Sequence, residues 1–137
     1  MRSFIVCAGL LLGLTFQSCS KEESLSKEEK LTSGLWKFHS YSTTDPSITM
    51  DSCNFDNTIL FYESGGGVRD EGIVVCSGSE QYSQLYWSFG ESSDILMIYD
   101  RWGIPSPTTL SSLSESKLVF EQELPYSSGT ITIVFKH

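Results

Sequence analysis

The sequence has few of the residues that most often carry out catalysis. It contains 2 histidines, His39 and His137, and it has no G-x-S-x-G, H-E-x-x-H or P-loop motif. Four side chains offer the hard oxygen ligands that calcium prefers, without the alternating spacing of a calcium loop: Asp51, Asn54, Asp56 and Asn57. We therefore expect a protein that is not an enzyme and has no metal and no cofactor. A hydrolase that uses carboxylates such as Asp100 is the alternative activity.

Basic residues are also scarce. The chain has 9 Lys and Arg against 17 Asp and Glu, which gives a formal net charge of −8. An acidic surface repels the phosphate backbone of nucleic acids and the anionic headgroups of lipids. We therefore expect no nucleic acid among the partners of this protein.

No hydrophobic run is long enough to cross a bilayer as a helix, which takes about 20 apolar residues. The apolar segment 4–16 follows the basic Arg2 and gives way to polar residues at Gln17. A short basic segment followed by an apolar segment of this length is typical of a secretory signal peptide. We expect residues 1–18 to be that signal peptide and to be absent from the mature protein.

The end of this segment, Phe16-Gln17-Ser18-Cys19, resembles the lipobox of bacterial lipoproteins. The resemblance implies cleavage before Cys19 and a diacylglyceryl group on its sulfur, which would anchor the mature chain in a membrane. The following Ser20-Lys21-Glu22-Glu23 resembles the signal that exports some Gram-negative lipoproteins to the outer face of the outer membrane; a solvated linker is the alternative. We expect a lipid-anchored outer-membrane protein exposed on the cell surface, with 19–30 as lipidated cysteine and tether and 31–137 as one domain.

The cysteines predict one disulfide bond. Of the 4 cysteines, Cys7 belongs to the signal peptide and Cys19 is the predicted lipid site, which leaves Cys53 and Cys76. Cysteines of exported proteins are usually oxidised, so we predict a bond between these two. Two buried free thiols are the alternative.

The remaining chain predicts an all-β fold. Ser26 and Glu29 have the spacing of a capping box and predict one short helical turn. After Gly34 helical periodicity is absent, and runs rich in β-branched and aromatic residues alternate with Gly, Ser, Asp and Pro. These runs predict eight strands near 34–42, 57–63, 67–75, 82–89, 95–100, 106–112, 117–123 and 130–136. Short connections favour an antiparallel up-and-down barrel, which has no exposed edge; a sandwich is the alternative.

Alternation along the strands predicts which side chains face the interior. The inward set is Trp36, Phe38, Ile59, Phe61, Leu85, Trp87, Phe89, Leu118, Phe120, Ile131, Ile133 and Phe135. Seven of these side chains are aromatic, and we expect them to fill most of the lumen. Segment 95–99 is apolar on both faces, so we expect a loop or a partner to cover its outside, with 100–109 as the candidate loop.

Gly34-Leu35-Trp36 at the start of the first strand matches the G-x-W signature of lipocalins. Together with the tether and the cysteine pair, it makes 31–137 resemble the lipocalin-like domains of bacterial envelope lipoproteins. The family places an arginine near the end of the last strand, where this chain has Lys136. The resemblance implies an eight-stranded barrel that often carries a small apolar ligand in its mouth, where Tyr99 and Trp102 are the candidate contacts; packing of these rings against the rim is the alternative.

The expected function is therefore that of a non-catalytic lipoprotein at the cell envelope. Its lipocalin-like domain would bind a small apolar ligand or a protein partner. A structural or accessory subunit of an outer-membrane complex is the main alternative, and segment 95–99, apolar on both faces, favours it.

Overall fold

The computed structural model describes residues 24–124 and 129–137, which form one short helix and eight strands. The predicted signal peptide, Cys19 and the first part of the predicted tether lie outside the described residues. The elements in chain order are α1 (Lys27–Thr32), β1 (Leu35–Thr43), the 3-10 turn η1 (Ser52–Asn54), β2 (Thr58–Phe61), β3 (Gly66–Asp70), β4 (Tyr82–Phe89), β5 (Ile95–Tyr99), β6 (Pro105–Leu113), β7 (Lys117–Glu123) and β8 (Thr130–Lys136). The prediction of eight strands is confirmed.

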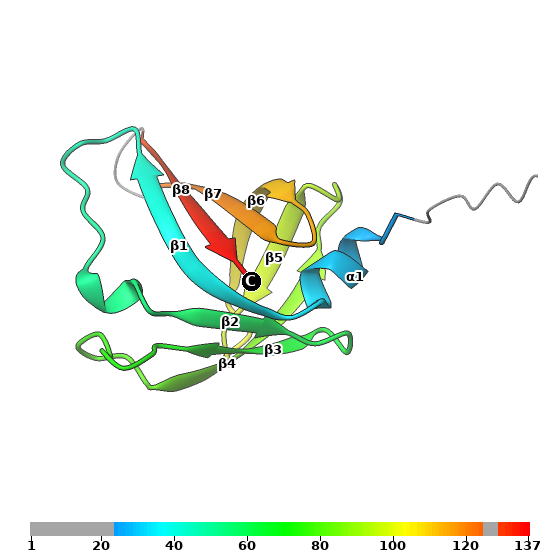
Figure 1. The fold of residues 1–137 in the computed structure, drawn as a ribbon, viewed down its shortest axis with the longest axis horizontal. Helices are drawn as coiled ribbons and strands as arrows, with labels where there is room; N and C mark the ends of the chain where they lie inside the picture. The colour runs from blue at the N-terminus through cyan, green and yellow to red at the C-terminus, as the bar shows by residue number, and fades with distance from the viewer. Residues whose placement is uncertain (1–23, 125–128) are drawn as a thin grey trace, which may run out of the picture.

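The strands form a closed antiparallel barrel (Figure 1). Each strand pairs with the next, and β1 closes the barrel by pairing with β8 from Lys37 opposite Lys136 to Thr43 opposite Ile131. Closure gives every strand a partner on both sides, so no strand lies at the edge of the sheet. The prediction of an up-and-down barrel is confirmed, and the sandwich alternative is wrong. No helix among the described residues has the length and apolar character needed to cross a membrane.

Two predicted segments differ from the structure. Strand β3 ends at Asp70 instead of continuing to Val75, because Gly72 has a positive φ of 76° and turns the chain into a loop in which Ile73 is 94% exposed. The predicted covering loop at 100–109 is also wrong. Its first half is a tight turn, and its second half is the start of β6, which pairs with β5 from Ile95 opposite Thr109 to Tyr99 opposite Pro105.

The interior follows the predicted alternation. The buried cluster contains the predicted Trp36, Ile59, Phe61, Leu85, Trp87, Leu118, Phe120 and Phe135, with Phe38, Phe89 and Ile133 packed against it. Helix α1 adds the fully buried Leu31 to this cluster and lies across one end of the barrel (Figure 1). The helix starts with the predicted capping box, in which the Glu29 amide donates to the Ser26 hydroxyl and the Ser26 amide donates to the Glu29 carboxylate.

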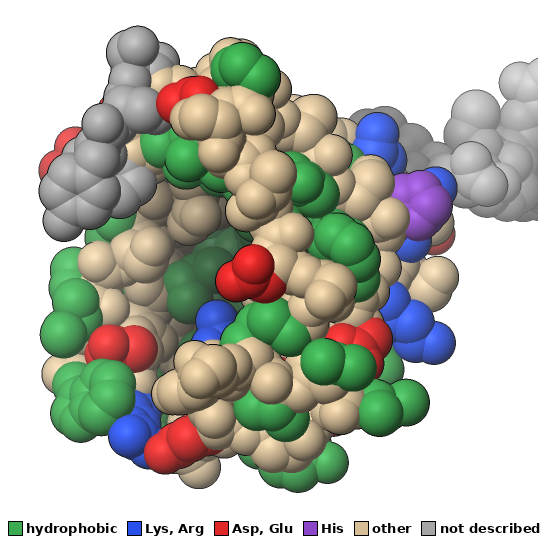
Figure 2. Space-filling view, turned by 90° about the vertical axis from the view of Figure 1, so that its left-hand side faces the viewer, with side chains coloured by type: hydrophobic (Ala, Val, Ile, Leu, Met, Phe, Trp, Pro, Cys, Tyr) green, Lys and Arg blue, Asp and Glu red, His purple; other side chains and the backbone are tan. Residues whose placement is uncertain are grey.

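The two ends of the barrel differ. The end beside α1 carries short turns, and there the Trp36 indole donates its Nε1–H to the Leu31 carbonyl at 2.8 Å. The opposite end carries the long connections 44–57 and 71–81, which lie at the left of Figure 1. Figure 2 looks onto this second end and shows a hollow with hydrophobic side chains in its depth. We call the two ends the closed end and the open end.

Candidate functional site

The open end contains a cavity of about 710 Å³ (Figure 2). Its apolar wall is formed by Ile59, Leu85 and Ile98, and its polar wall by Arg69, Ser83, Ser106, Thr108 and Gln122. The expectation that aromatic side chains fill the lumen is wrong for this end. None of the seven predicted aromatic residues lines this cavity, whose wall carries smaller or polar side chains that leave space.

Arg69 is placed in this cavity by the register of β3. It lies opposite Ile59 on β2 and Ser83 on β4, and cross-strand partners share one face of a sheet. Since Ile59 is buried in the core, Arg69 also projects inward. Its side chain remains 47% exposed because it borders the hollow. A guanidinium group therefore stands inside a largely apolar barrel.

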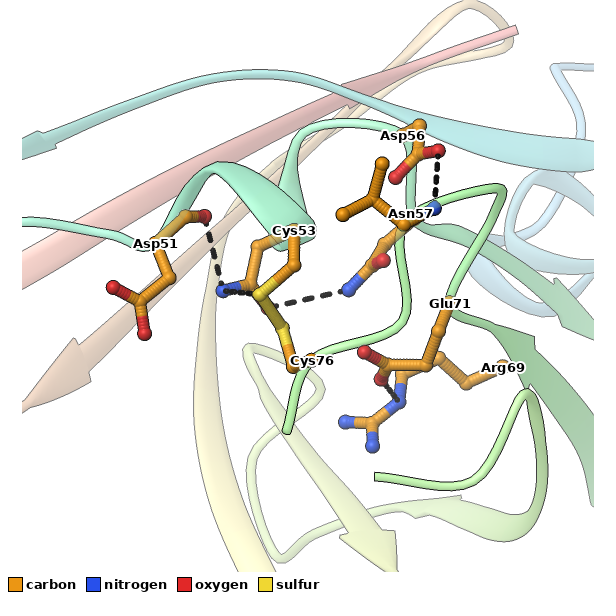
Figure 3. The surroundings of a disulfide bond; sticks show 9 residues. Asp51, Cys53, Asp56, Asn57, Arg69, Glu71 and Cys76 are labelled. Atoms are coloured by element: carbon orange, nitrogen blue, oxygen red, sulfur yellow. Dashed lines mark hydrogen bonds and ion pairs between the residues drawn. A yellow bond between two sulfur atoms is a disulfide. The ribbon is translucent and has the colours of Figure 1, made fainter. Parts of the chain in front are cut away.

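Glu71 is the ion-pair partner of Arg69. Its side chain is 3% exposed, and Oε1 lies 3.1 Å from Nε of Arg69 (Figure 3). The other carboxylate oxygen, Oε2, is buried and has no hydrogen-bond partner among the described residues. A buried carboxylate that loses its cation is strongly destabilising, so Glu71 and Arg69 depend on each other. No other hydrogen bond or ion pair joins the Arg69 side chain to the described residues, and its terminal nitrogens remain available.

A second polar pair lies across the barrel from Arg69. Gln122 on β7 donates through Nε2 to the hydroxyl of Thr108 on β6 at 2.9 Å. Thr108 is almost completely buried, and both residues line the cavity. Buried polar groups are tolerated when they form hydrogen bonds with one another. This pair therefore gives the wall polar groups in fixed positions with little loss of stability.

The rim of the cavity is formed by the turn between β5 and β6. Asp100 shapes this turn, because its Oδ1 accepts hydrogen bonds from the amides of Trp102 and Ile104 at 2.9 Å each. Arg101 binds both carboxylate oxygens of Glu80 at 2.6 and 2.7 Å. The charges at the rim are thus engaged within the protein.

The two predicted ligand contacts, Tyr99 and Trp102, both line the cavity. Tyr99 is the last residue of β5 and is half-buried. Trp102 is 71% exposed, and the guanidinium of Arg101 lies 4.2 Å from the centre of its ring. The structure therefore places both predicted residues at the same cavity, although Tyr99 pairs with the exposed Tyr86 and Trp102 projects into solvent.

The predicted disulfide between Cys53 and Cys76 is present and joins the two long loops of the open end (Figure 3). Beside it, Oδ2 of Asp56 accepts hydrogen bonds from the amides of Ile73 and Val74 at 2.6 and 3.3 Å. The side chain of Asp56 thus fixes the second loop to the first. Among the described residues, no group of His, Cys, Asp and Glu is arranged to hold a metal ion.

The predicted barrel signature lies at the closed end, away from the cavity. Trp36 is completely buried, and its ring stacks on His137 with centroids 3.9 Å apart. A side chain at Gly34 would crowd the same imidazole, because a Cβ there would lie 3.0 Å from Cε1 of His137. The sequence analysis assigned no role to His137, the residue that packs on the tryptophan.

Sequence reasoning also missed Arg69, Glu71, Thr108 and Gln122. For Arg69 and Glu71 the available signal was alternation along the third predicted strand, and the structure has Gly67 and Arg69 on the inward face and Glu71 buried. A positive and a negative side chain two positions apart on an inward face indicate a buried ion pair.

Comparison with known proteins found no matching family model and no matching curated protein.

Proposed function

We propose that this protein is a non-catalytic binding module of the cell envelope that takes up one small, partly apolar ligand through the open end of its barrel. The observation that carries the proposal is the cavity of about 710 Å³. Ligand sites typically enclose about 300–1,000 Å³ and combine apolar walls with a few fixed polar groups. Ile59, Leu85 and Ile98 supply such an apolar wall here.

A binding role fits the charged groups of the cavity better than a hydrolytic role. Hydrolysis by carboxylates needs one group that gives a proton and a second that attacks or activates water. Of the carboxylates that line the cavity, Glu80 is held by Arg101 and Asp100 is held by backbone amides of its own turn. Both therefore serve the structure of the rim.

The proposal includes an anchor at Cys19 in the outer membrane. Helix α1 starts at Lys27, at the closed end of the barrel. A chain from Cys19 to Lys27 reaches at most about 28 Å when fully extended. A lipid on Cys19 would thus hold the closed end nearer to the bilayer and leave the open end facing away from it, accessible to ligands in the surrounding medium.

The ligand proposal is tested with N-phenyl naphthylamine, an uncharged apolar dye that fluoresces when it leaves water. The mature chain should bind it saturably. Ile98→Trp fills the cavity from inside β5 and should weaken binding at least about tenfold, as expected when a bulky side chain occupies the site. Met97→Trp is the matched control, because Met97 is the neighbouring residue on the same strand and does not line the cavity. Absence of saturable binding to the wild-type protein would refute the proposal, as would full binding by Ile98→Trp.

The anchor is tested by intact mass and by membrane fractionation of the protein made in a Gram-negative host. We expect an acylated chain that begins at Cys19 and remains with the outer membrane. Cys19→Ala should release the protein from the membrane fraction, whereas Cys7→Ala, which alters only the signal peptide, should leave the anchor in place. An unmodified mature mass would exclude the anchor.

A second candidate function is that of an accessory subunit, favoured by apolar side chains exposed on the loops of the open end. Ile73 is 94% exposed, and Val74, Trp102 and Ile104 are also exposed. Exposed apolar groups gathered in one region are typical of protein interaction sites. A photo-crosslinking residue at position 73 should then capture one specific envelope protein, and the same residue at Glu115, in a turn of the closed end, should not. Identical crosslinks from both positions would exclude this role.

A further inference from the structure

We propose that Arg69 binds an anionic group of the ligand, so that the cavity selects small amphipathic anions bearing a carboxylate, sulfonate or phosphate. This inference rests on the proposed function and adds to it the chemical class of the ligand. It also changes the expectation from the sequence, which was a small apolar ligand.

The geometry of the guanidinium is the first argument. Arginine has five N–H donors in a planar fork and can serve two anions at separate edges. Glu71 contacts the Nε edge at 3.1 Å. In Figure 3 the dashed line from the Glu71 carboxylate ends on Nε of Arg69, and no dashed line reaches the two terminal nitrogens. One edge of the fork therefore holds the arginine in place, and the other edge is open for a ligand.

The distribution of charge around the cavity is the second argument. Four charged residues line it, namely Arg69, Glu80, Asp100 and Arg101. Arg101 and Glu80 neutralise each other at the rim, and Asp100 is occupied by two amides of its turn. Glu71 is buried behind Arg69 and does not line the cavity. Arg69 therefore offers its two terminal nitrogens inside the barrel, whereas Arg101 lies at the rim against Glu80 and Trp102. An anion is the group that uses the donors of Arg69 best.

The remaining wall defines the rest of the ligand. Ile59, Leu85 and Ile98 accept a compact apolar body, such as one or two fused rings. Thr108 and Gln122 lie on the opposite wall, where hydroxyl and amide groups can bond to polar substituents. A mixed wall of this kind favours a short body with polar substituents over a long unsubstituted chain.

The test compares two dyes with the same skeleton. Anilinonaphthalene sulfonate carries a sulfonate, and N-phenyl naphthylamine does not. Arg69→Gln should weaken binding of the sulfonate dye about tenfold, the effect of losing a hydrogen bond to a charged group. Binding of the uncharged dye should change less than about twofold, because the apolar wall is intact. Arg69→Lys keeps the charge and loses the fork, so it should give an intermediate loss for the sulfonate dye.

Two further variants control for structure. Lys117→Gln removes a positive charge at the closed end, outside the cavity, and it should leave the affinity for the sulfonate dye near that of the wild type. Arg69→Gln leaves Glu71 buried without its cation, so the double variant Arg69→Gln with Glu71→Gln is measured beside it. The double variant should lose affinity for the sulfonate dye to the same extent as Arg69→Gln.

The outcomes separate this inference from the proposed function. The inference would be overturned if Arg69→Gln and the double variant bound the sulfonate dye as tightly as the wild-type protein does. It would also be overturned if these variants lost equal affinity for both dyes, or if the wild-type protein bound only the uncharged dye. In these cases the cavity still binds small molecules. Failure of the wild-type protein to bind either dye would overturn the proposed function itself and the inference with it.

Discussion

The imidazole of His137 stacks on the indole of Trp36 with ring centroids 3.9 Å apart. The two residues come from opposite ends of the domain, from the start of β1 and the end of the chain. Nδ1 of His137 also donates to the Leu35 carbonyl at 3.2 Å, and Nε2 lies 3.0 Å from the Ser33 hydroxyl. The last residue of the chain thus helps to close the barrel beneath α1.

Because of this contact, the losses of stability caused by substitutions at His137 and at Trp36 should be coupled. His137→Ala should lower the free energy of unfolding by about 0.5–1 kcal/mol, the usual worth of a stacked aromatic pair. Trp36→Leu should cost more, about 3 kcal/mol, because it removes a buried ring and leaves the Leu31 carbonyl without its donor. Denaturant unfolding of the two single variants and of their double variant measures both effects. The cost of His137→Ala should be smaller in the Trp36→Leu background, where only the contacts of His137 with Ser33 and Leu35 remain to be lost; strict additivity would contradict the contact.

Because of the disulfide, the stability of the protein should depend on whether the two cysteines are oxidised or reduced. Replacing Cys53 and Cys76 together by Ala should lower the free energy of unfolding by about 3 kcal/mol, because the bond closes a loop between residues 23 positions apart. Urea unfolding with and without a reducing agent gives the measurement. Reduction should shift the midpoint of the wild-type protein toward that of the double alanine variant and leave the variant unaffected. Equal midpoints for the oxidised wild type and the variant would show that the bond adds no stability.

Gly67 occupies a position in β3 that has no room for a side chain. A Cβ there would lie 2.6 Å from the Leu60 carbonyl oxygen and 2.8 Å from Cδ1 of Leu85. Gly67→Ala should therefore destabilise the protein by about 1–3 kcal/mol, the typical cost of overpacking. The matched control is Gly66→Ala, one residue earlier, where a Cβ would meet nothing closer than 3.7 Å. Thermal unfolding should place this control within about 0.5 kcal/mol of the wild type; the reverse order would refute the packing argument.

Because of the capping box, the stability of the first turn of α1 should depend on pH. The backbone and side-chain hydrogen bonds from Ser26 lower the pKa of Glu29 below its ordinary value of 4.5. A carboxylate whose pKa is lowered by folding stabilises the folded state fully at pH values above its unfolded pKa. This stabilisation is lost as the pH falls through the pKa of the folded state. An NMR titration of the Glu29 carboxyl carbon should show the shift. Ser26→Pro keeps the backbone φ of −61° and removes the donating amide, so the pKa should return toward 4.5; an unchanged titration would contradict the assignment.

Much of the fold follows from local patterns in the sequence. The spacing of apolar residues in β4 places Leu85, Trp87 and Phe89 on one face, as the structure has them. The capping box at Ser26 and the cysteine pair could also be predicted from the sequence, because each depends on residue types and spacing. The end of β3 was not predicted, since Gly72 only permits the turn, and the loop after Asp70 is held by the disulfide and by Asp56, which are remote in sequence.

Residue types and their spacing were enough to predict the number of strands, their inward and outward faces, and the two cysteines available for a bond, because these depend on a period of two and on the chemistry of single residues. The hollow at the open end, the pairing of Arg69 with Glu71 at its wall, and the packing of His137 on Trp36 became visible only in the folded barrel. The physical reason is that the space inside a barrel depends on the side chains that all its strands contribute at one height, and these side chains meet only after the strands have closed.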